Sequence, residues 1–355
     1  MAIQPSAREL PGSTDFLGFP NIREFAERGL IDAVADWQAK YGDIFQVKLG
    51  PSNTMIFIIH PDDVRHVTLT HADNYIKGAT YDGARKYLLG NGVLTSTGET
   101  WKRQRRLMSP FYTPRGVTEF ADIMLRDTLA VSERWDKLAD SGEDVEMMDE
   151  MALVTSSIIL KAIFSTEADE DILTIKRAVE TMIAYVSDSR RNPLALPAWV
   201  PTERNRTYQQ ARDMVHSYID GVLDTRFAMN EADYPNDLLS KLILAEDPET
   251  GERMSRDLLR DEAITNFFAG YETSARTMSY AWYALAVNAE VRANLHAELD
   301  SELGDDAPTL DDLKRLPYTM RVIKETMRLY PPAPLYARNV VEDDVIRGYH
   351  IPAGS

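Results

Sequence analysis

The sequence has no cysteine in its 355 residues. Disulfides, thiolate metal ligands and a cysteine nucleophile are therefore excluded for this stretch. It also has no run of eighteen consecutive apolar residues, so we expect no membrane span. The segment from Met1 to Leu10 lacks a basic part followed by an apolar one, so we expect neither a signal peptide nor a membrane anchor. We therefore expect a cytoplasmic protein.

Positive charge is scarce as well, with 39 Lys and Arg against 56 Asp and Glu and a net charge of −17. This balance argues against general nucleic-acid binding. Phosphate-binding loops, dinucleotide loops and the nucleophile elbow of hydrolases are missing from the sequence. The six histidines do not show the spacing of a metal site; they stand at positions 60, 66, 71, 216, 296 and 350.

The sequence has strong helical periodicity. Apolar runs at 44–49 and 54–59 predict a strand pair, and the residues from 340 to 355 predict short strands around Gly348. Between them we expect helices near 116–139, 147–165, 168–186, 205–229, 255–286, 289–303 and 318–329. The pattern predicts a mainly α protein with small β-sheets, of the α+β class.

The longest expected helix, 255–286, carries polar residues in its apolar middle. Ser255 is a suitable N-cap, and about thirty residues would span roughly 45 Å. At its centre lies the run Ala269-Gly270-Tyr271-Glu272-Thr273-Ser274. Gly costs about 1 kcal/mol relative to Ala in a helix, and buried polar groups are costly. The run is either a polar kink in a core helix or a gap where a small ligand fits and protons are relayed.

A second signal lies near the C-terminus. Glu325 and Arg328 share one helix face, although most such pairs are solvated. The run from Leu329 to Pro334 then stops the helix and extends the chain, and Arg338 follows. An Arg beside an apolar extended segment suits an anionic group on an apolar ligand. The alternative is an ordinary helix stop with a surface Arg.

A third signal is the run from Trp101 to Arg106. Trp101 and Arg105 are four residues apart on a helix, and both side chains only donate hydrogen bonds, so together they could bind a carboxylate. The alternatives are a solvated helix face, or a core Trp with Arg extending past it.

In this order, the three signals resemble the cytochrome P-450 family of heme-thiolate monooxygenases. The flanking runs agree: Gly92-Val93-Leu94, Trp199 to Thr202, Asp237 to Ser240, and Asp261-Glu262. The resemblance covers residues from about 35 to the end. It implies a single domain over 1–355, with a β-rich part at about 35–70, a helical part at about 71–330 and the start of a C-terminal β region at 335–355.

The resemblance also implies a role for each matching residue. The residues expected to bind heme b (iron protoporphyrin IX) are Trp101, Arg105 and Arg338 at its propionates, and Ala269 and Gly270 against its face. Thr273 is expected to hydrogen-bond the oxygen being activated, and Glu272 to feed protons to it. Glu325 and Arg328 are expected to form a buried structural ion pair.

The family resemblance further implies a substrate and partners. We expect a small apolar substrate, fatty acid or terpenoid-like, hydroxylated with dioxygen and two electrons. Its pocket would be lined by Phe267, Phe268, Tyr271, Ala333 and Leu335, with the Pro-rich stretch 193–201 as a mobile roof; core packing is the alternative for each.

Electrons would come from NAD(P)H through a ferredoxin, flavodoxin or reductase domain that docks near Lys102, Arg103 and Arg106. We expect a bacterial-type, monomeric enzyme.

One feature departs from the family. Its iron ligand is a Cys thiolate, which we expect beyond Ser355, so the fold would be incomplete at the C-terminus. We therefore predict that the 355-residue chain by itself is inactive. The alternative function is a heme-free helical scaffold or ligand-binding fragment of the same fold.

Overall fold

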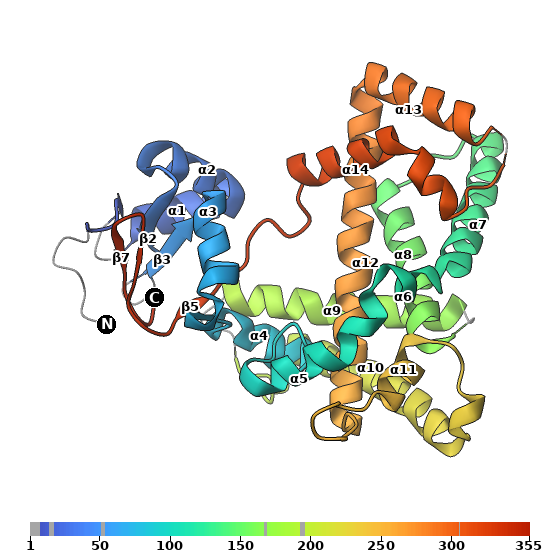
Figure 1. The fold of residues 1–355 in the computed structure, drawn as a ribbon, viewed down its shortest axis with the longest axis horizontal. Helices are drawn as coiled ribbons and strands as arrows, with labels where there is room; N and C mark the ends of the chain where they lie inside the picture. The colour runs from blue at the N-terminus through green and yellow to red at the C-terminus, as the bar shows by residue number, and fades with distance from the viewer. Residues whose placement is uncertain (1–7, 14–17, 51–53, 167–168, 192–195, 305) are drawn as a thin grey trace. The chain divides into compact units, whose positions relative to one another are not determined.

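The computed structural model describes residues 8–13, 18–50, 54–166, 169–191, 196–304 and 306–355. It forms two compact units, residues 1–81 with 334–355 and residues 82–333 (Figure 1). The chain is mostly helical, at 68%, with small sheets, which confirms the predicted fold class. The single domain over 1–355 stays a prediction.

The first unit combines small sheets with short helices. Strand β2 (Ile44–Lys48) pairs parallel with β1 (Gly12–Ser13) and antiparallel with β3 (Thr54–Ile58), which confirms the predicted strand pair. Two further two-stranded sheets join β4 (Tyr75–Ile76) to β5 (Asn339–Val340) and β6 (Asp344–Ile346) to β7 (Tyr349–Ile351). The helical segments are α1 (Phe19–Arg28), α2 (Leu30–Tyr41), α3 (Pro61–Arg65), a π-helix (His66–Thr70) and 3-10 turns at Ala72–Asn74 and Ala79–Tyr81.

Aromatic packing holds α2 against the three-stranded sheet. Phe45 and Phe57 are cross-strand partners, and their rings stack 5.2 Å apart. Trp37 of α2 lies 6.0 Å from Phe57. The β6–β7 hairpin turns at Arg347 and Gly348, which both have positive φ, as a two-residue hairpin turn requires. The strands expected around Gly348 are thus confirmed.

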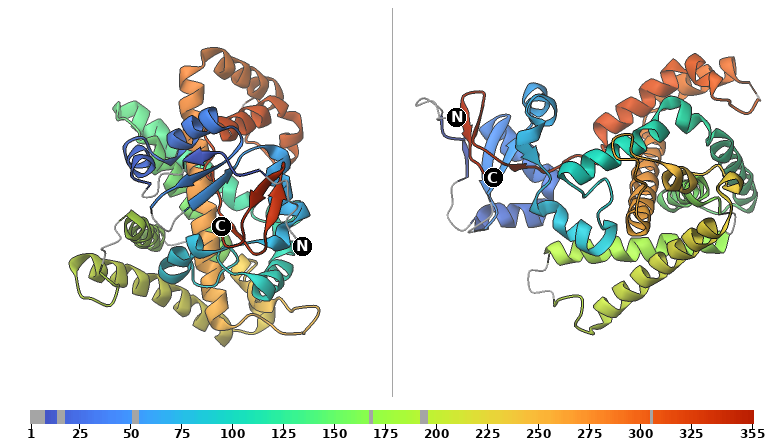
Figure 2. Two further views of the ribbon diagram at one scale, coloured as in Figure 1. Left: turned by 90° about the vertical axis from the view of Figure 1, so that its left-hand side faces the viewer. Right: turned by 60° about the horizontal axis from the view of Figure 1, so that its bottom comes forward.

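The second unit is helical. Its elements are α4 (Asp82–Ala84), a π-helix (Arg85–Leu89), α5 (Gly98–Met108), a 3-10 turn (Ser109–Tyr112), α6 (Pro114–Thr118), α7 (Ala121–Ser141), α8 (Met147–Phe164), α9 (Asp169–Arg191), α10 (Glu203–Ala228), a 3-10 turn (Glu231–Asp233), α11 (Leu238–Leu244), α12 (Arg256–Val287), α13 (Ala289–Glu302), a 3-10 turn (Asp311–Arg315) and α14 (Pro317–Leu329). Helices α9 and α10 pack against each other (Figure 2).

Helix α12 is the long central helix that the periodicity predicts. The Ser255 hydroxyl caps it by accepting from the Leu258 N–H at 3.3 Å. It packs along α8 (Figure 1), and one stripe of its side chains, including Ile264, Phe267 and Tyr271, enters the main core. The structure therefore confirms the predicted cap and the predicted extent of the helix.

Most predicted helices begin and end within a few residues of the observed ones. The helix expected at 116–139 is instead divided, because α6 ends at Thr118 and Phe120 leaves the helical conformation before α7. Helices α1, α2 and α11 were not predicted, since each is short and propensity alone is a weak guide to a short helix. Within the described ranges, no helix is both long enough and apolar enough to cross a membrane.

Candidate functional site

Within the run 269–274 of α12, Ala269, Glu272, Thr273 and Ser274 stay at least partly exposed. Ala269 is exposed, and the Thr273 hydroxyl donates to the Ala269 carbonyl at 2.8 Å. One turn later, Thr277 makes the same kind of bond to Thr273, at 2.9 Å. These bonds within the helix satisfy both hydroxyl protons and leave the Thr273 oxygen lone pairs available.

The Glu272 carboxylate forms an ion pair within α12. Arg276, one turn further along α12, donates to it at 2.6 Å. The sequence analysis missed Arg276 as a partner, although its i,i+4 spacing from Glu272 is the signal that predicts such a pair.

Gly270 does not lie on the open face with Ala269. A side-chain carbon at Gly270 would come within 2.8 Å of Ile159 Cδ1, on α8. The missing side chain therefore lets two helices approach closely. In this structure Gly270 therefore has a packing role rather than the expected position beside a cofactor, because it lies on the side of α12 that faces α8.

Two of the predicted pocket residues belong to the core. Phe267 and Tyr271 are buried and stack on each other at 5.0 Å, and burial raises the pKa of Tyr271. Their prediction as pocket lining is corrected to the alternative, core packing. Phe268 is only half-buried and Ala333 is exposed, so both remain candidates for pocket lining.

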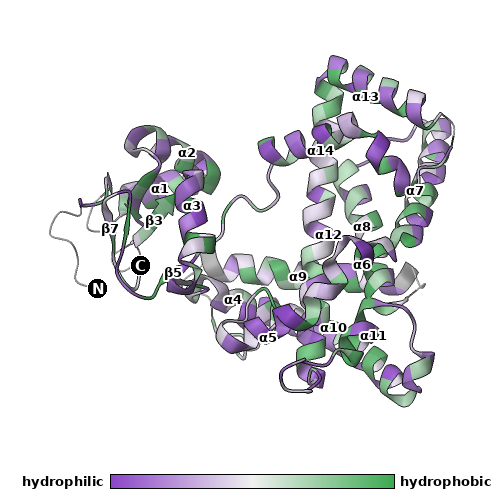
Figure 3. Cartoon of the chain, viewed as in Figure 1, coloured by the Kyte–Doolittle hydropathy of each residue, from purple (hydrophilic) through white to green (hydrophobic). Residues whose placement is uncertain are grey.

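Helix α5 presents Trp101 and Arg105 on one face, and the helix is largely hydrophilic (Figure 3). Trp101 is 37% exposed. The Arg105 guanidinium is exposed and has no hydrogen-bond or ion-pair partner in the described part of the chain. A guanidinium without a carboxylate in a protein of net charge −17 suits an anionic ligand.

The neighbouring arginines of α5 form ion pairs within the chain. Arg103 Nε lies 3.2 Å from the buried Asp247 carboxylate, and Arg106 Nη2 lies at the same distance from it. Arg103 also pairs with Glu252 at 3.3 Å, and Arg106 with Glu249 at 2.9 Å. These acids balance the charges of both arginines, whose expected role in partner docking stays a prediction.

Glu325 and Arg328 pair as predicted but not in a buried place. Arg328 donates two hydrogen bonds to Glu325, at 2.8 and 2.6 Å, and more than half of each side chain is exposed. The hydrogen bond and charge of Arg328 lower the pKa of Glu325. The predicted burial is wrong for this structure, because no described residue covers the outer face of α14 at this point.

Arg338 lies in the first unit, between Tyr336 and β5. It donates to the Tyr81 hydroxyl at 3.1 Å and to the Ala337 carbonyl at 2.8 Å, and its guanidinium lies 5.0 Å from the Tyr336 ring centre. Neutral groups hold the side chain in place without cancelling its charge. Leu335, two residues from Ala337, is exposed.

The predicted roof is only partly described, since residues 192–195 lie outside the described ranges. The rest is fixed by α10: Asn205 donates to the carbonyls of Pro197 and Val200 at 2.7 and 2.8 Å, and Gln209 donates to that of Ala198 at 2.7 Å. Trp199 is 79% exposed on this segment.

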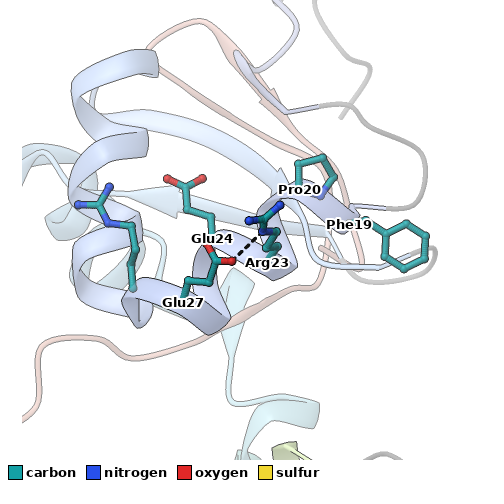
Figure 4. Close-up of a pocket in the computed structure, with 6 residues that line it drawn as sticks. Phe19, Pro20, Arg23, Glu24 and Glu27 are labelled. Carbon is teal, nitrogen blue, oxygen red and sulfur yellow. Dashed lines mark hydrogen bonds and ion pairs between the residues drawn. The ribbon is translucent and has the colours of Figure 1, made fainter.

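A surface hollow on α1 offers no comparable chemistry (Figure 4). Arg23 and Glu27 pair across it at 2.7 Å, and Glu24 accepts from the Trp37 indole. Arg28, the fourth charged residue of the hollow, pairs with Asp36, so each charged group has a partner and we assign the hollow no ligand.

Within the second unit, the donors of α5 fit a carboxylate of a heme. Trp101 and Arg105 can only donate, Arg105 lacks a partner among the described residues, and Ala269 leaves room beside the Thr273 hydroxyl. Arg338, in the first unit, is a donor of the same kind, and its expected role at a propionate stays a prediction. The sequence contains no cysteine, so a thiolate ligand does not come from these 355 residues.

Comparison with known proteins identifies relatives of the whole chain. The family model for cytochrome P-450 matches residues 11–355. Cyclooctatin synthase of Streptomyces melanosporofaciens is 33% identical over 316 residues, covering 89% of this chain and 67% of that protein. Cyclooctat-9-en-7-ol 5-monooxygenase of the same organism is 34% identical over 320 residues, with the same coverage. A solved cytochrome P-450 heme domain shares the fold, with a TM-score of 0.88 at 24% identity over 98% of this chain and 76% of that one. The chain therefore belongs to the cytochrome P-450 family of monooxygenases.

Proposed function

We propose that this chain carries the oxygen-side and carboxylate-binding residues of a heme b monooxygenase that hydroxylates an apolar, terpenoid-like molecule. The proposal depends most on the Arg105 guanidinium, which has no hydrogen-bond or ion-pair partner in the described part of the chain. The neighbouring Lys102, Arg103 and Arg106 all pair with carboxylates. When bound, the heme supplies the oxidising chemistry that no amino-acid side chain provides.

In this function, α5 holds the cofactor by a carboxylate, and the Trp101 indole and the Arg105 guanidinium donate from one helix face. Arg338 is proposed as a further donor to a carboxylate of the cofactor. Charge-assisted bonds of this kind are about twice as strong as neutral ones. The Tyr81 hydroxyl bonds one Arg338 nitrogen and so orients the guanidinium.

The chain moves protons through Thr273 and Glu272. The Thr273 hydroxyl can turn from the Ala269 carbonyl to donate outward, because its bond of 2.8 Å lies within one helix turn. Glu272 is the nearest acid in sequence, and Arg276 holds its carboxylate at 2.6 Å. An acid beside an alcohol can pass protons through water to a reacting oxygen.

The substrate class follows from the lining and from the relatives. Phe268, Ala333 and Leu335 offer apolar or small side chains that the core does not fully bury. The two Streptomyces relatives are named for cyclooctatin and for an unsaturated alcohol, cyclooctat-9-en-7-ol. We therefore favour a cyclic, mostly hydrocarbon substrate over a fatty acid.

Electrons are proposed to come from NAD(P)H through a separate redox partner. Arg103 and Arg106 already pair with acids of the chain, and Lys102, the third residue named for docking, is exposed and pairs with Glu99. Neutralising Lys102 alone should therefore change partner affinity only slightly.

Heme titration of the chain, followed by absorbance, tests the proposal. The wild type should bind one heme per chain, and Arg105→Ala should weaken binding about tenfold through loss of a charge-assisted bond. Lys102→Ala, a neighbouring charge on the same helix, is the matched control and should leave the affinity unchanged. Absence of binding by the wild type would support the heme-free scaffold instead.

The substrate class is tested in the heme-loaded chain. A cyclic terpenoid alcohol should perturb the heme spectrum at lower concentration than a long-chain fatty acid does, and Phe268→Ala should weaken the effect of the alcohol. The reverse order of the two ligands would overturn the terpenoid assignment.

A further inference from the structure

Two neighbouring acids in the first half of α12 accept hydrogen bonds from the backbone of the turn that precedes α5. Asp261 accepts from the Asn91 N–H at 2.7 Å, and Glu262 accepts from the Val93 N–H at 3.1 Å. Glu262 is fully buried, and a buried carboxylate is stable only where hydrogen bonds compensate its lost hydration. We call Asp261 and Glu262 the acidic clamp.

Glycine makes the close approach of this turn possible. A side chain at Gly90, which has a φ of +53°, would lie 2.2 Å from the Asp261 carboxylate. A side chain at Gly92 would lie 2.0 Å from the Thr265 hydroxyl, one turn along α12. The turn therefore sits directly on the helix backbone and has little freedom to shift.

The turn is also joined to α5 itself. Gln104, which is 1% exposed, donates to the Asn91 carbonyl at 2.6 Å. In the 3-10 turn that follows α5, the Tyr112 hydroxyl donates to Asn266, which in turn donates to the Glu262 carbonyl at 2.7 Å. The segments before and after α5 are thus both bonded to the same stretch of α12, residues 261–266.

We infer that the acidic clamp is a positioning device for the cofactor residues. The clamp fixes α5, which carries Trp101 and Arg105, against α12, which carries Thr273. The two carboxylate donors are therefore held at a constant distance from the Thr273 hydroxyl. Asp261 and Glu262 themselves act through the turn and α5 and need no contact with the cofactor. This inference rests on the proposed heme-binding function for its consequence, but the clamp itself can be measured without heme.

The test compares Glu262→Ala with Glu262→Gln. Alanine removes the acceptor for the Val93 N–H, whereas glutamine keeps it. Amide hydrogen exchange of the heme-free chain should be faster in Glu262→Ala at Val93 and along 98–108, and heme affinity should fall about tenfold, as expected when a buried donor loses its partner. Glu262→Gln should restore both.

Two further variants separate the clamp from a general loss of stability. Gly92→Ala should displace the turn while keeping both acids, and should reproduce the faster exchange at 98–108. Asp127→Asn removes a different buried acid, bonded to Ser157 and Lys161, and should leave exchange at 98–108 unchanged. If Glu262→Ala leaves exchange and heme affinity as in the wild type, or changes exchange equally throughout residues 82–333, the clamp is wrong. If the wild type binds no heme while the exchange pattern is as expected, the proposed function fails and the clamp stands.

Discussion

Thr273 is the residue on which the proposed proton delivery depends. Among the described residues, its hydroxyl bonds to its own helix alone, at the Ala269 carbonyl, and the side chain stays partly exposed. Thr273→Ala should uncouple electron consumption from product formation in protein competent for turnover, because the hydroxyl proton donor is lost. The measurement is the ratio of product formed to NAD(P)H consumed.

The matched control for Thr273 is Thr277, which makes the same kind of bond one turn further along α12. Thr277→Ala should leave the coupling ratio unchanged, and Thr273→Ser should restore most of it. Equal coupling in Thr273→Ala and the wild type would remove Thr273 from the relay.

Gly270 illustrates what helical periodicity cannot decide. The sequence marks Gly270 as a position with a special reason for glycine, but the identity of the neighbour depends on which helix lies opposite. In the structure the neighbour is Ile159 of α8, and a Cβ atom added at Gly270 would lie 2.8 Å from its Cδ1 atom. The same limit applies to Phe267 and Tyr271, whose apolar character fits both a pocket and a core.

This packing role gives a stability prediction. Gly270→Val should lower the free energy of unfolding by about 1–3 kcal/mol, the usual cost of overpacking a close contact. Combining it with Ile159→Ala should recover part of the loss, so the double-mutant cycle should show favourable coupling. Additive effects in thermal or urea unfolding would show that the two residues are not in contact.

At the level of elements, α5 shows why a run of charges does not define a docking surface. The sequence predicts the helix face of Trp101 and Arg105 correctly, since both lie on the exposed side. It could not predict that Arg103 and Arg106 reach Asp247, because that ion pair joins residues more than a hundred positions apart. Local spacing predicts contacts along one helix and says little about contacts between segments.

Helix α14 carries a second prediction at this scale. The Glu325–Arg328 pair is exposed, so water competes for both partners and the pair adds little to stability. Glu325→Gln should leave the midpoint of thermal unfolding of this chain unchanged. A large drop in the midpoint would instead indicate the buried ion pair that the family resemblance implies.

The link between β6 and the π-helix of residues 66–70 predicts a pH effect. Burial of Asp344 is outweighed by hydrogen bonds from His66, Tyr75 and the Val345 N–H, and the pKa of Asp344 is lowered as a result. A lowered carboxyl pKa in the folded state stabilises the fold above the ordinary pKa of aspartate, and that contribution is lost as the pH falls through the lowered value.

Acid unfolding followed by circular dichroism checks this effect. Asp344→Asn should reduce the dependence of stability on pH below about 4, whereas Asp32→Asn, at an exposed position, should not. An identical acid transition in Asp344→Asn and the wild type would contradict the assigned role.

For the whole molecule, the periodicity of apolar residues predicted the fold class, and the ordered motifs predicted the family. The strand pair, the Ser255 cap, the central helix and the β6–β7 hairpin all follow from local patterns. Other features depend on packing between segments that are distant in the sequence, which a single sequence does not display. They are the core position of Phe267, the exposure of Glu325 and the acidic clamp.

The central claim is that these 355 residues hold a heme by its carboxylates without supplying a thiolate ligand. The most direct measurement is the absorption spectrum of the chain after addition of heme, reduction and exposure to carbon monoxide. We predict saturable heme binding that Arg105→Ala weakens, and a spectrum without the Soret band of thiolate ligation. A thiolate-type band, or the absence of any heme binding by the wild-type chain, would contradict the claim.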